Sequence, residues 1–307
     1  MSSLFDLSLI DSTLRMMAPL LLAGLGGAIC ARVGIFNVGL DGLMLMGAFI
    51  GVAANAFTNN IWLSILIAVV GTILFSLLFG YMVIHLQANM IVTGIAINFL
   101  SIGVTTFALR TIFDVQGAYY NNEMVGLPTW KIPVIDDIPL LGNLLSGQSP
   151  IVYLGILITI AMYIFLKKSV LGSHFDAVGI NPVAAKSQGI KIKKIQYQAV
   201  IISGILCALG GVQLSLGQVT MFSENMTGGR GFIALVATML GQSNPIGVFL
   251  SSGLFGFTEA ISIRFQGLNI PTNFTLMLPY VITILAMFVF KDRTQLNAMK
   301  NSQGSSR

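Results

Sequence analysis

Long uncharged stretches make up most of this chain, separated by short polar interruptions. No Asp, Glu, Lys or Arg occurs between Gly42 and Leu109. Such a stretch cannot form the surface of a soluble domain. It therefore predicts several helices in lipid. A helix of about 20 residues crosses the hydrocarbon core at a rise of about 1.5 Å per residue. The uncharged runs predict spans at about 14–31, 34–56, 61–84, 90–109, 150–166, 197–217, 231–242, 246–263 and 272–290.

Two features of this pattern are irregular. The run 231–242 is too short to cross a bilayer, so we expect a half-helix or a re-entrant segment there. Arg32, Asn37 and Asp41 interrupt the boundary between the first two spans. The sequence therefore predicts an all-α, polytopic membrane protein with about eight to ten transmembrane helices, some of them short. These helices are expected to form a single transmembrane domain over residues 1–307.

The composition supports this class and excludes others. Hydrophobic residues make up 55% of the chain and charged residues 9%, against about 25% charged in soluble domains. Ten of the 16 Lys and Arg residues lie in two segments, which leaves no basic face for nucleic acid. Cys30 and Cys207 lie in apolar runs and read as small packed hydrophobes. No basic region precedes an apolar core at the N-terminus, so no cleaved signal peptide is expected.

The basic residues predict the orientation in the membrane. Loop 167–195 carries six lysines and tail 291–307 carries four basic residues, so we expect both on the cytoplasmic side. Loop 114–149 has four acidic residues against the single Lys131 and is expected outside. Counting the spans back from these loops places the N-terminus outside as well.

A short helix is predicted inside the basic loop. Asn181 is a favoured N-cap and Pro182 is tolerated at the first helical position. Gly189 can adopt the left-handed conformation that ends a helix. A helix this short is not stable alone in water, so it needs a surface to pack on. Ala184 and Ala185 offer a low-relief face to another protein, and the alternative is a capped helix that merely connects two spans.

Three segments resemble one family of membrane proteins. The segment GINPVAAKSQGI, residues 179–190, resembles the cytoplasmic coupling helix in permease subunits of ABC importers for branched-chain amino acids, ribose and nucleosides. GIFNVGLDGLMLMGAF, residues 34–49, is similar to the asparagine–glycine stretch after the first core helix of that family. The segment 229–235, followed by Asn244-Pro245, is the third match. The resemblance covers about residues 14–290.

The resemblance implies a function and partners. The ending NVGLDG, residues 37–42, is similar to the nucleoside and simple-sugar branch, so we expect nucleoside transport. Simple sugars or branched-chain amino acids remain alternatives within the family. The implied partners are a cytoplasmic ABC ATPase, a second permease chain that is homologous to this one but different from it, and an extracytoplasmic solute-binding lipoprotein. The resemblance assigns contact with the ATPase to Gly179, Asn181, Pro182, Ala184, Ala185 and Gly189.

Polar residues within the spans are candidates for lining the translocation path. A carboxylate at the bilayer centre costs about 2.5–3.5 kcal/mol on insertion scales, so Asp41 should pair or face water. Arg32 is one possible partner. The alternative is that Asp41 is an interfacial residue that bonds the backbone of a broken helix. Asn98 and Glu259 carry the same two interpretations, and Asn37 is a further candidate for the path.

The sequence lacks the motifs of several enzymes. No Gly-Lys dipeptide occurs, so no phosphate-binding P-loop is present. No H-E-x-x-H occurs, and no catalytic or metal-ligating residue and no bound cofactor are expected. If ATP drives transport, another polypeptide must hydrolyse it. A secondary transporter is the remaining alternative, but few intramembrane ionisable residues are available for ion coupling. A membrane-embedded enzyme is another, but no cluster of nucleophile and base is visible.

Overall fold

The computed structural model describes residues 7–130, 147–266, 277 and 281. The predicted tail 291–307 lies outside the described residues, as does nearly all of the predicted span 272–290 and the middle of loop 114–149. The helices and strands are α1 (Leu7–Arg32), α2 (Leu40–Thr58), α3 (Ile61–Gly80), α4 (Met90–Phe113), β1 (Ala118–Tyr119), α7 (Pro150–Lys168), α8 (Val170–Ile180), α9 (Pro182–Ser187), α10 (Ile192–Val212), β2 (Phe222–Ser223), α11 (Arg230–Leu240) and α12 (Pro245–Gln266). Single π-helical turns extend α3 to His85 and α10 to Val219.

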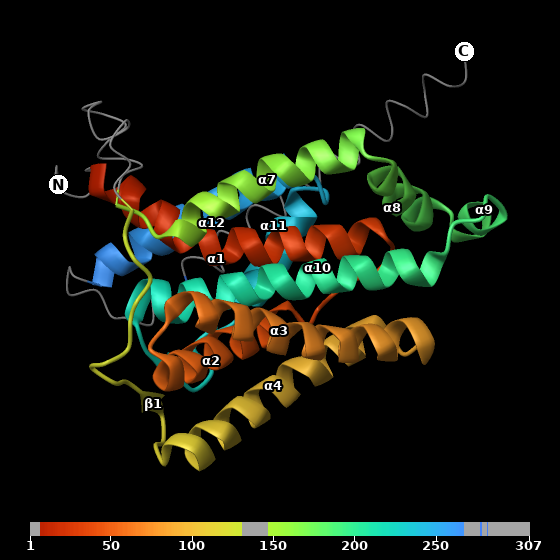
Figure 1. Ribbon diagram of the computed structural model, residues 1–307. Helices are drawn as coiled ribbons and strands as arrows, with labels where there is room; N and C mark the ends of the chain where they lie inside the picture. The colour runs from red at the N-terminus through yellow and green to blue at the C-terminus, as the bar shows by residue number, and fades with distance from the viewer. Residues whose placement is uncertain (1–6, 131–146, 267–276, 278–280, 282–307) are drawn as a thin grey trace.

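Seven helices in the described part of the chain are long and apolar enough to cross a membrane. They are α1, α2, α3, α4, α7, α10 and α12, and each overlaps a predicted span, with ends that differ by at most seven residues. They lie roughly side by side in one elongated bundle (Figure 1). The prediction of an all-α, polytopic architecture is therefore confirmed.

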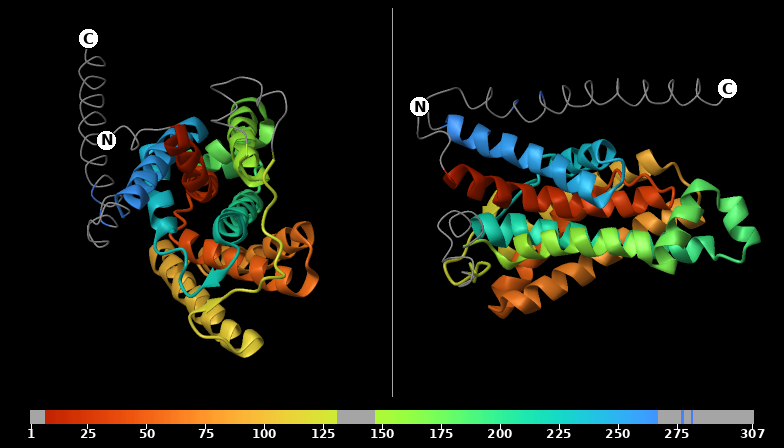
Figure 2. Two further views of the ribbon diagram at one scale, coloured as in Figure 1. Left: turned by 90° about the vertical axis from the view of Figure 1, so that its left-hand side faces the viewer. Right: turned by 90° about the horizontal axis from the view of Figure 1, so that it is seen from above.

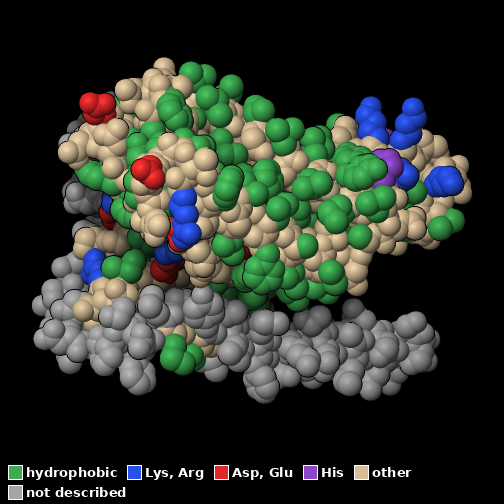
Figure 3. Space-filling view, turned by 90° about the horizontal axis from the view of Figure 1, so that it is seen from below, with side chains coloured by type: hydrophobic (Ala, Val, Ile, Leu, Met, Phe, Trp, Pro, Cys, Tyr) green, Lys and Arg blue, Asp and Glu red, His purple; other side chains and the backbone are tan. Residues whose placement is uncertain are grey.

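The bundle has an inner and an outer set of helices. In the most apolar windows of α1, α2 and α10, 78–83% of residues are buried inside the protein, against 28–39% in α3, α4, α7 and α12. The outer helices expose large apolar side chains such as Leu74, Phe99 and Leu157. Hydrophobic side chains also spread along the face shown in Figure 3. Such outer surfaces fit a hydrocarbon solvent, which covers apolar side chains without a protein partner.

Small residues let the inner helices approach closely. A Cβ atom on Gly211 of α10 would lie 2.1 Å from the carbonyl oxygen of Met44 in α2. A Cβ atom on Gly47 would lie 2.7 Å from Cα of Ala208. No side chain fits at either position, so α2 and α10 meet backbone to backbone. Close packing of this kind replaces the hydrophobic effect as the attraction between helices in lipid.

The two ends of the bundle differ. At one, which we call the strand end, β1 pairs antiparallel with β2, and Gln148 donates a hydrogen bond to the carbonyl oxygen of Asp11 at 3.2 Å. At the other, which we call the α9 end, α8 and α9 project beyond the long helices (Figures 1 and 2). The start of α1 and the described parts of loop 114–149 thus share one end, as the span count predicts.

Two departures from regular helices lie inside the bundle. The second span begins at Leu40 and not at 34, because residues 33–39 form a non-helical link that contains Gly34 at φ +77°. The run 231–242 is the half-helix α11, preceded by the turns of 224–229. Glu224 pairs with Arg110 near the strand end, and Ser243 meets Arg32 at the α9 end. This segment therefore crosses the bundle as turns plus half a helix and is not re-entrant.

Candidate functional site

The projecting helix α9 has the local structure that its sequence predicts. The Asn181 side chain accepts a hydrogen bond from the backbone N–H of Ala184 at 3.1 Å, and Pro182 occupies the first turn. Gly189 has φ +81° just beyond the helix. An N-cap of this kind stabilises a helix by about 1 kcal/mol. The cap and the glycine stop fix the six residues Pro182–Ser187 as a helix.

Helix α9 presents one face to its own protein and the other outward. Ala185 is only 3% exposed, so the expectation that both alanines face a partner is wrong for Ala185, which attaches α9 to the chain. Ala184 is exposed. The most exposed apolar side chains are Ile180 at 84% and Val183 at 74%. Two bulky apolar groups, rather than a low-relief alanine face, therefore form the tip of the α9 end.

Basic residues surround this tip. Figure 3 shows Lys and Arg side chains gathered at the end of the molecule that carries α8 and α9. The exposed lysines of the segment are Lys167, Lys168, Lys186, Lys191, Lys193 and Lys194. An apolar centre with a polar rim is the usual anatomy of a protein-binding surface. A partner that docks here would need an apolar groove with acidic edges.

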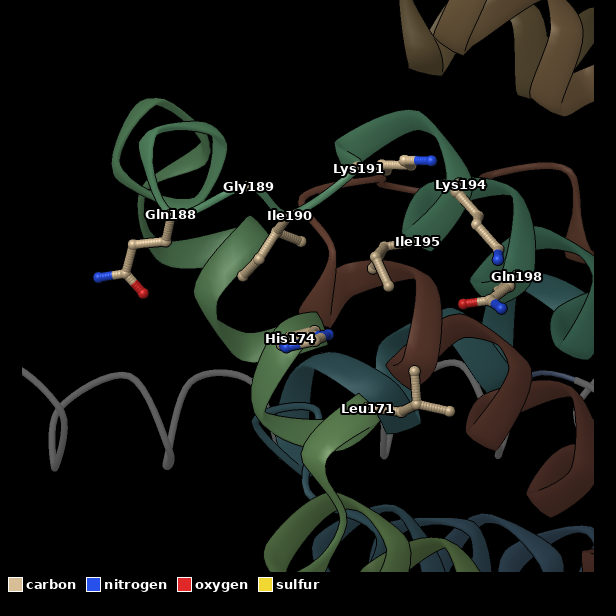
Figure 4. A pocket seen from close by; sticks show the side chains of 9 residues that line it. All are labelled: Leu171, His174, Gln188, Gly189, Ile190, Lys191, Lys194, Ile195 and Gln198. Atoms are coloured by element: carbon tan, nitrogen blue, oxygen red, sulfur yellow. The ribbon is translucent and has the colours of Figure 1, made fainter.

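A pocket of about 360 Å³ lies between α8, the linker that follows α9 and the start of α10. Leu171 and His174 of α8 face it from one side, and Ile195 and Gln198 of α10 from the other (Figure 4). The linker residues 188–191 cross its rim. The linker is thus not packed tightly on the bundle, and Ala185 is the buried point of attachment within α9.

Helix α8 is joined firmly to the end of α1. Arg32 pairs with Asp176 at 2.8 Å and not with Asp41, for which the sequence had offered it as one possible partner. Arg32 ends α1 at the α9 end, whereas Asp41 starts α2 inside the bundle. Gly179 lies directly on the carbonyl group of Arg32, where a Cβ atom would come within 2.0 Å of the oxygen. Gly179 is therefore a packing residue in this conformation.

Asp41 lies where the N-termini of α2 and α11 meet. Its carboxylate accepts a hydrogen bond from the backbone N–H of Gly231 at 2.8 Å and from the Thr227 hydroxyl at 3.2 Å. The residue is 5% exposed. The positive ends of two helix dipoles stabilise a carboxylate at this point. Asp41 thus bonds the backbone of a broken helix, which is one of the two predicted interpretations.

The side chains of Asn37 and Asn98 form hydrogen bonds with backbone groups in and next to the non-helical link before α2. Asn37 accepts from the N–H of Gly39 at 3.0 Å and donates to the Ser203 hydroxyl at 3.3 Å. Asn98 accepts from the N–H of Gly42 at 2.8 Å and donates to the carbonyl of Val38 at 3.0 Å. The oxygen and the nitrogen of each side-chain amide are therefore both used in hydrogen bonds within the protein. These bonds stabilise the fold because a backbone group without a hydrogen-bond partner has a high free-energy cost in lipid.

Glu259 differs from the other three candidates because part of its side chain has no partner among the residues that the structure describes. Its Oε1 accepts from Arg230 Nε at 2.9 Å and also contacts Nη2 of the same guanidinium. Its Oε2 is buried and accepts no hydrogen bond from residues 7–130 or 147–266. Arg230 also donates to the carbonyl of Met226 at 3.2 Å. The ion pair thus anchors the turns before α11, and one carboxylate oxygen keeps its capacity to accept.

Sequence reasoning gave no role to Thr227, Arg230 or Asp176. A signal for Arg230 exists, because it is the single charged residue between positions 225 and 258. A lone arginine in an uncharged stretch requires a partner inside the bundle. The sequence contains no local signal for Asp176, whose partner Arg32 is 144 positions away.

The sequence and the fold of this chain are similar to those of known membrane transport proteins. The chain is 36% identical to the guanosine ABC transporter permease protein NupQ of Bacillus subtilis, over 93% of this chain and 92% of the relative. It is 34% identical to the nucleoside ABC transporter permease protein NupC of Lactococcus lactis, over 89% and 88%. Its fold resembles a chain of an ABC transporter solved in an inward-facing conformation, with a TM-score of 0.51 and 15% identity over 91% of this chain and 84% of that chain.

The sequence also matches a family model across most of its length. The model is described as branched-chain amino acid transport system / permease component, and it matches residues 9–287. This match spans every described helix from α2 to α12 and nearly all of α1. The chain therefore belongs to the branched-chain amino acid transport system / permease component family, as a multi-pass membrane protein.

Proposed function

We propose that this chain is a membrane subunit of an ABC importer for nucleosides, driven by ATP hydrolysis on a separate subunit. The observation that carries the proposal is α9. It is a capped helix at the tip of the bundle, held by the buried Ala185, with Ile180 and Val183 exposed among lysines. An ATPase that closes on this surface would push on α8 and the long helices, and alternating access would follow.

The substrate assignment rests on the relatives and on the chemistry of the bundle. Both relatives named above are permease proteins for guanosine or nucleosides. A path poor in charge suits a neutral solute that makes hydrogen bonds. Asn37, Asp41 and Asn98 are committed to the backbone in this conformation, so Glu259 is the strongest of the four candidates for substrate contact. The N–H and O–H groups of a nucleoside are suitable donors to its Oε2.

The remaining partners follow from the same proposal. A second permease chain, different from this one, would complete the path, and an extracytoplasmic lipoprotein would deliver the solute to the strand end. The α9 end and the C-terminus would face the cytoplasm of a cell whose plasma membrane holds the complex. We propose no bound cofactor for this subunit, and ATP would be bound and hydrolysed by the partner, because this sequence has no phosphate-binding P-loop.

Reconstitution tests the proposal. The chain alone in vesicles should neither hydrolyse ATP nor accumulate solute, whereas the assembly with ATPase, second permease and binding protein should accumulate labelled guanosine against a gradient. Excess unlabelled nucleoside should block this uptake, and ribose or leucine should not. Inhibition by leucine or by sugars, with none by nucleosides, would move the substrate to another branch of the family. Concentrative uptake by the chain without ATP would overturn the ABC assignment.

A further inference from the structure

Arg32 joins three parts of the molecule through one side chain. It is the last residue of α1. Its Nη1 donates to Asp176 Oδ1 of α8 at 2.8 Å, and its Nε donates to the carbonyl oxygen of Ser243 at 3.0 Å. Ser243 lies in the turn between α11 and α12. The guanidinium therefore links the segment that carries α9 to the hairpin formed by α11 and α12.

The α8 side of this joint is tight. Gly179 packs on the Arg32 carbonyl group so closely that a Cβ atom would lie 2.0 Å from the oxygen. Asn181, two residues on, caps α9. Ala185 then buries α9 against its own chain. A displacement of α9 thus reaches Arg32 through a short, continuous set of contacts.

The two helices of the α11–α12 hairpin are held to each other at both ends, and both also pack on α1. At its turn, a Cβ atom on Gly241 would lie 2.4 Å from the backbone nitrogen of Val248. Asn244 caps α12 by accepting from the N–H of Ile246 at 3.1 Å. At the other end of α11, the Arg230–Glu259 ion pair crosses between the two helices. Packing at one end and a charge pair at the other therefore hold α11 to α12.

The far end of the hairpin reaches the interior of the bundle. There the N–H of Gly231 donates to Asp41 at the start of α2. A Cβ atom on Gly231 would lie 2.2 Å from Cα of Asp41, so α11 and α2 are in backbone contact. Movement of the hairpin would consequently act on α2 at the junction that holds Asp41.

We infer that Arg32 is a positioning residue, through which displacement of the α8–α9 segment moves the α11–α12 hairpin and, with it, the Asp41 junction. The inference rests on the proposed function, because a docked ATPase would supply the displacement. It predicts that loss of the joint separates ATP hydrolysis from transport, without preventing either the ATPase from docking or the helices from inserting.

The first test uses the complete complex in proteoliposomes. Arg32→Gln and Asp176→Asn remove the ion pair, Asp176→Glu keeps a carboxylate, and Arg15→Gln breaks an ion pair near the opposite end of the same helix. ATP hydrolysis and guanosine uptake are measured separately. Arg32→Gln and Asp176→Asn should keep hydrolysis within about twofold and raise the ATP used per guanosine by tenfold or more. The two controls should keep the wild-type ratio, and an unchanged ratio in the test variants would overturn the inference.

The second test needs no substrate. Spin labels at Ser173 of α8 and Ile246 of α12, both exposed, report the distance between the two elements in the purified full-length chain. The distribution should be narrow in wild type and in Asp176→Glu, and broad in Arg32→Gln and Asp176→Asn. Equal distributions would refute the joint. Absence of guanosine uptake by the wild-type complex would instead refute the proposed function and leave this measurement valid.

Discussion

At the scale of single residues, the polar side chains inside this bundle mainly serve its backbone. Asn37 and Asn98 replace the hydrogen bonds that the link before α2 lacks, and Asp41 caps α11. A broken helix is tolerated at membrane depth only where protein groups or water satisfy its backbone. The break between α1 and α2 and the three polar residues around it are therefore one structural feature.

Asn98 is the residue whose structural role can be measured most directly. Asn98→Ala would leave the N–H of Gly42 and the carbonyl of Val38 unmatched, and should lower the free energy of unfolding by about 1–3 kcal/mol. Titration of the purified chain with a denaturing detergent measures this change. Asn60→Ala removes an exposed N-cap and should lower it by about 1 kcal/mol or less. Equal stability of wild type and Asn98→Ala would show that water or another group can replace the amide.

Glu259 is expected to affect transport by more than the loss of its ion pair with Arg230 destabilises the fold. In Glu259→Gln, an amide oxygen that keeps the bond to Arg230 places the amide nitrogen where Oε2 was, so an acceptor becomes a donor. A lost substrate hydrogen bond of about 1.4 kcal/mol lowers kcat/KM for uptake roughly tenfold. Uptake kinetics of the reconstituted complex test this, with the unfolding titration as the control for stability. Unchanged kinetics would confine Glu259 to its ion pair.

At the scale of elements, the sequence predicts features that depend on neighbouring residues, such as helix ends, but not contacts between segments that are far apart in the chain. The cap at Asn181 and the stop at Gly189 depend on neighbouring residues, so α9 was predicted with its ends. Uncharged runs likewise predicted the seven long helices. The burial of Ala185 and the partner of Arg32 depend on distant segments, and the local pattern contains no information about them. The path, coupling and partner assignments stay predictions.

The outer face of α9 gives a test at this scale. Val183→Asp places a charge in the apolar centre of the proposed docking surface and should weaken ATPase association by about 1–3 kcal/mol, roughly 5- to 150-fold. Ser187→Asp, on the same helix and also exposed, adds the same charge beside the basic rim as the matched control. Titration of the ATPase against the purified chain measures both. Equal affinity for wild type and Val183→Asp would exclude Val183 from the interface.

At the scale of the whole molecule, charge and shape separate the two ends. The α9 end gathers exposed lysines around α8 and α9 (Figure 3). The strand end holds the start of α1, the two short strands and the described parts of loop 114–149. Between them lies a band of exposed apolar side chains on the outer helices. A molecule of this kind has two possible orientations in a bilayer, and the lysines favour the one with the α9 end in the cytoplasm.

Labelling of cysteines in intact cells decides between these orientations. Ser173→Cys lies on α8 at the α9 end, and Glu123→Cys lies in loop 114–149 at the strand end, both at exposed positions. The native Cys30 and Cys207 are buried, so we expect the maleimide to label them little in the unsubstituted protein. A membrane-impermeant maleimide should label Glu123→Cys in intact cells and Ser173→Cys only after the membrane is opened. The prediction follows because moving the lysines of loop 167–195 across the bilayer during insertion is unfavourable. Labelling of Ser173→Cys from outside, with Glu123→Cys protected, would invert the molecule, and the docking surface proposed for the ATPase would then face the wrong compartment.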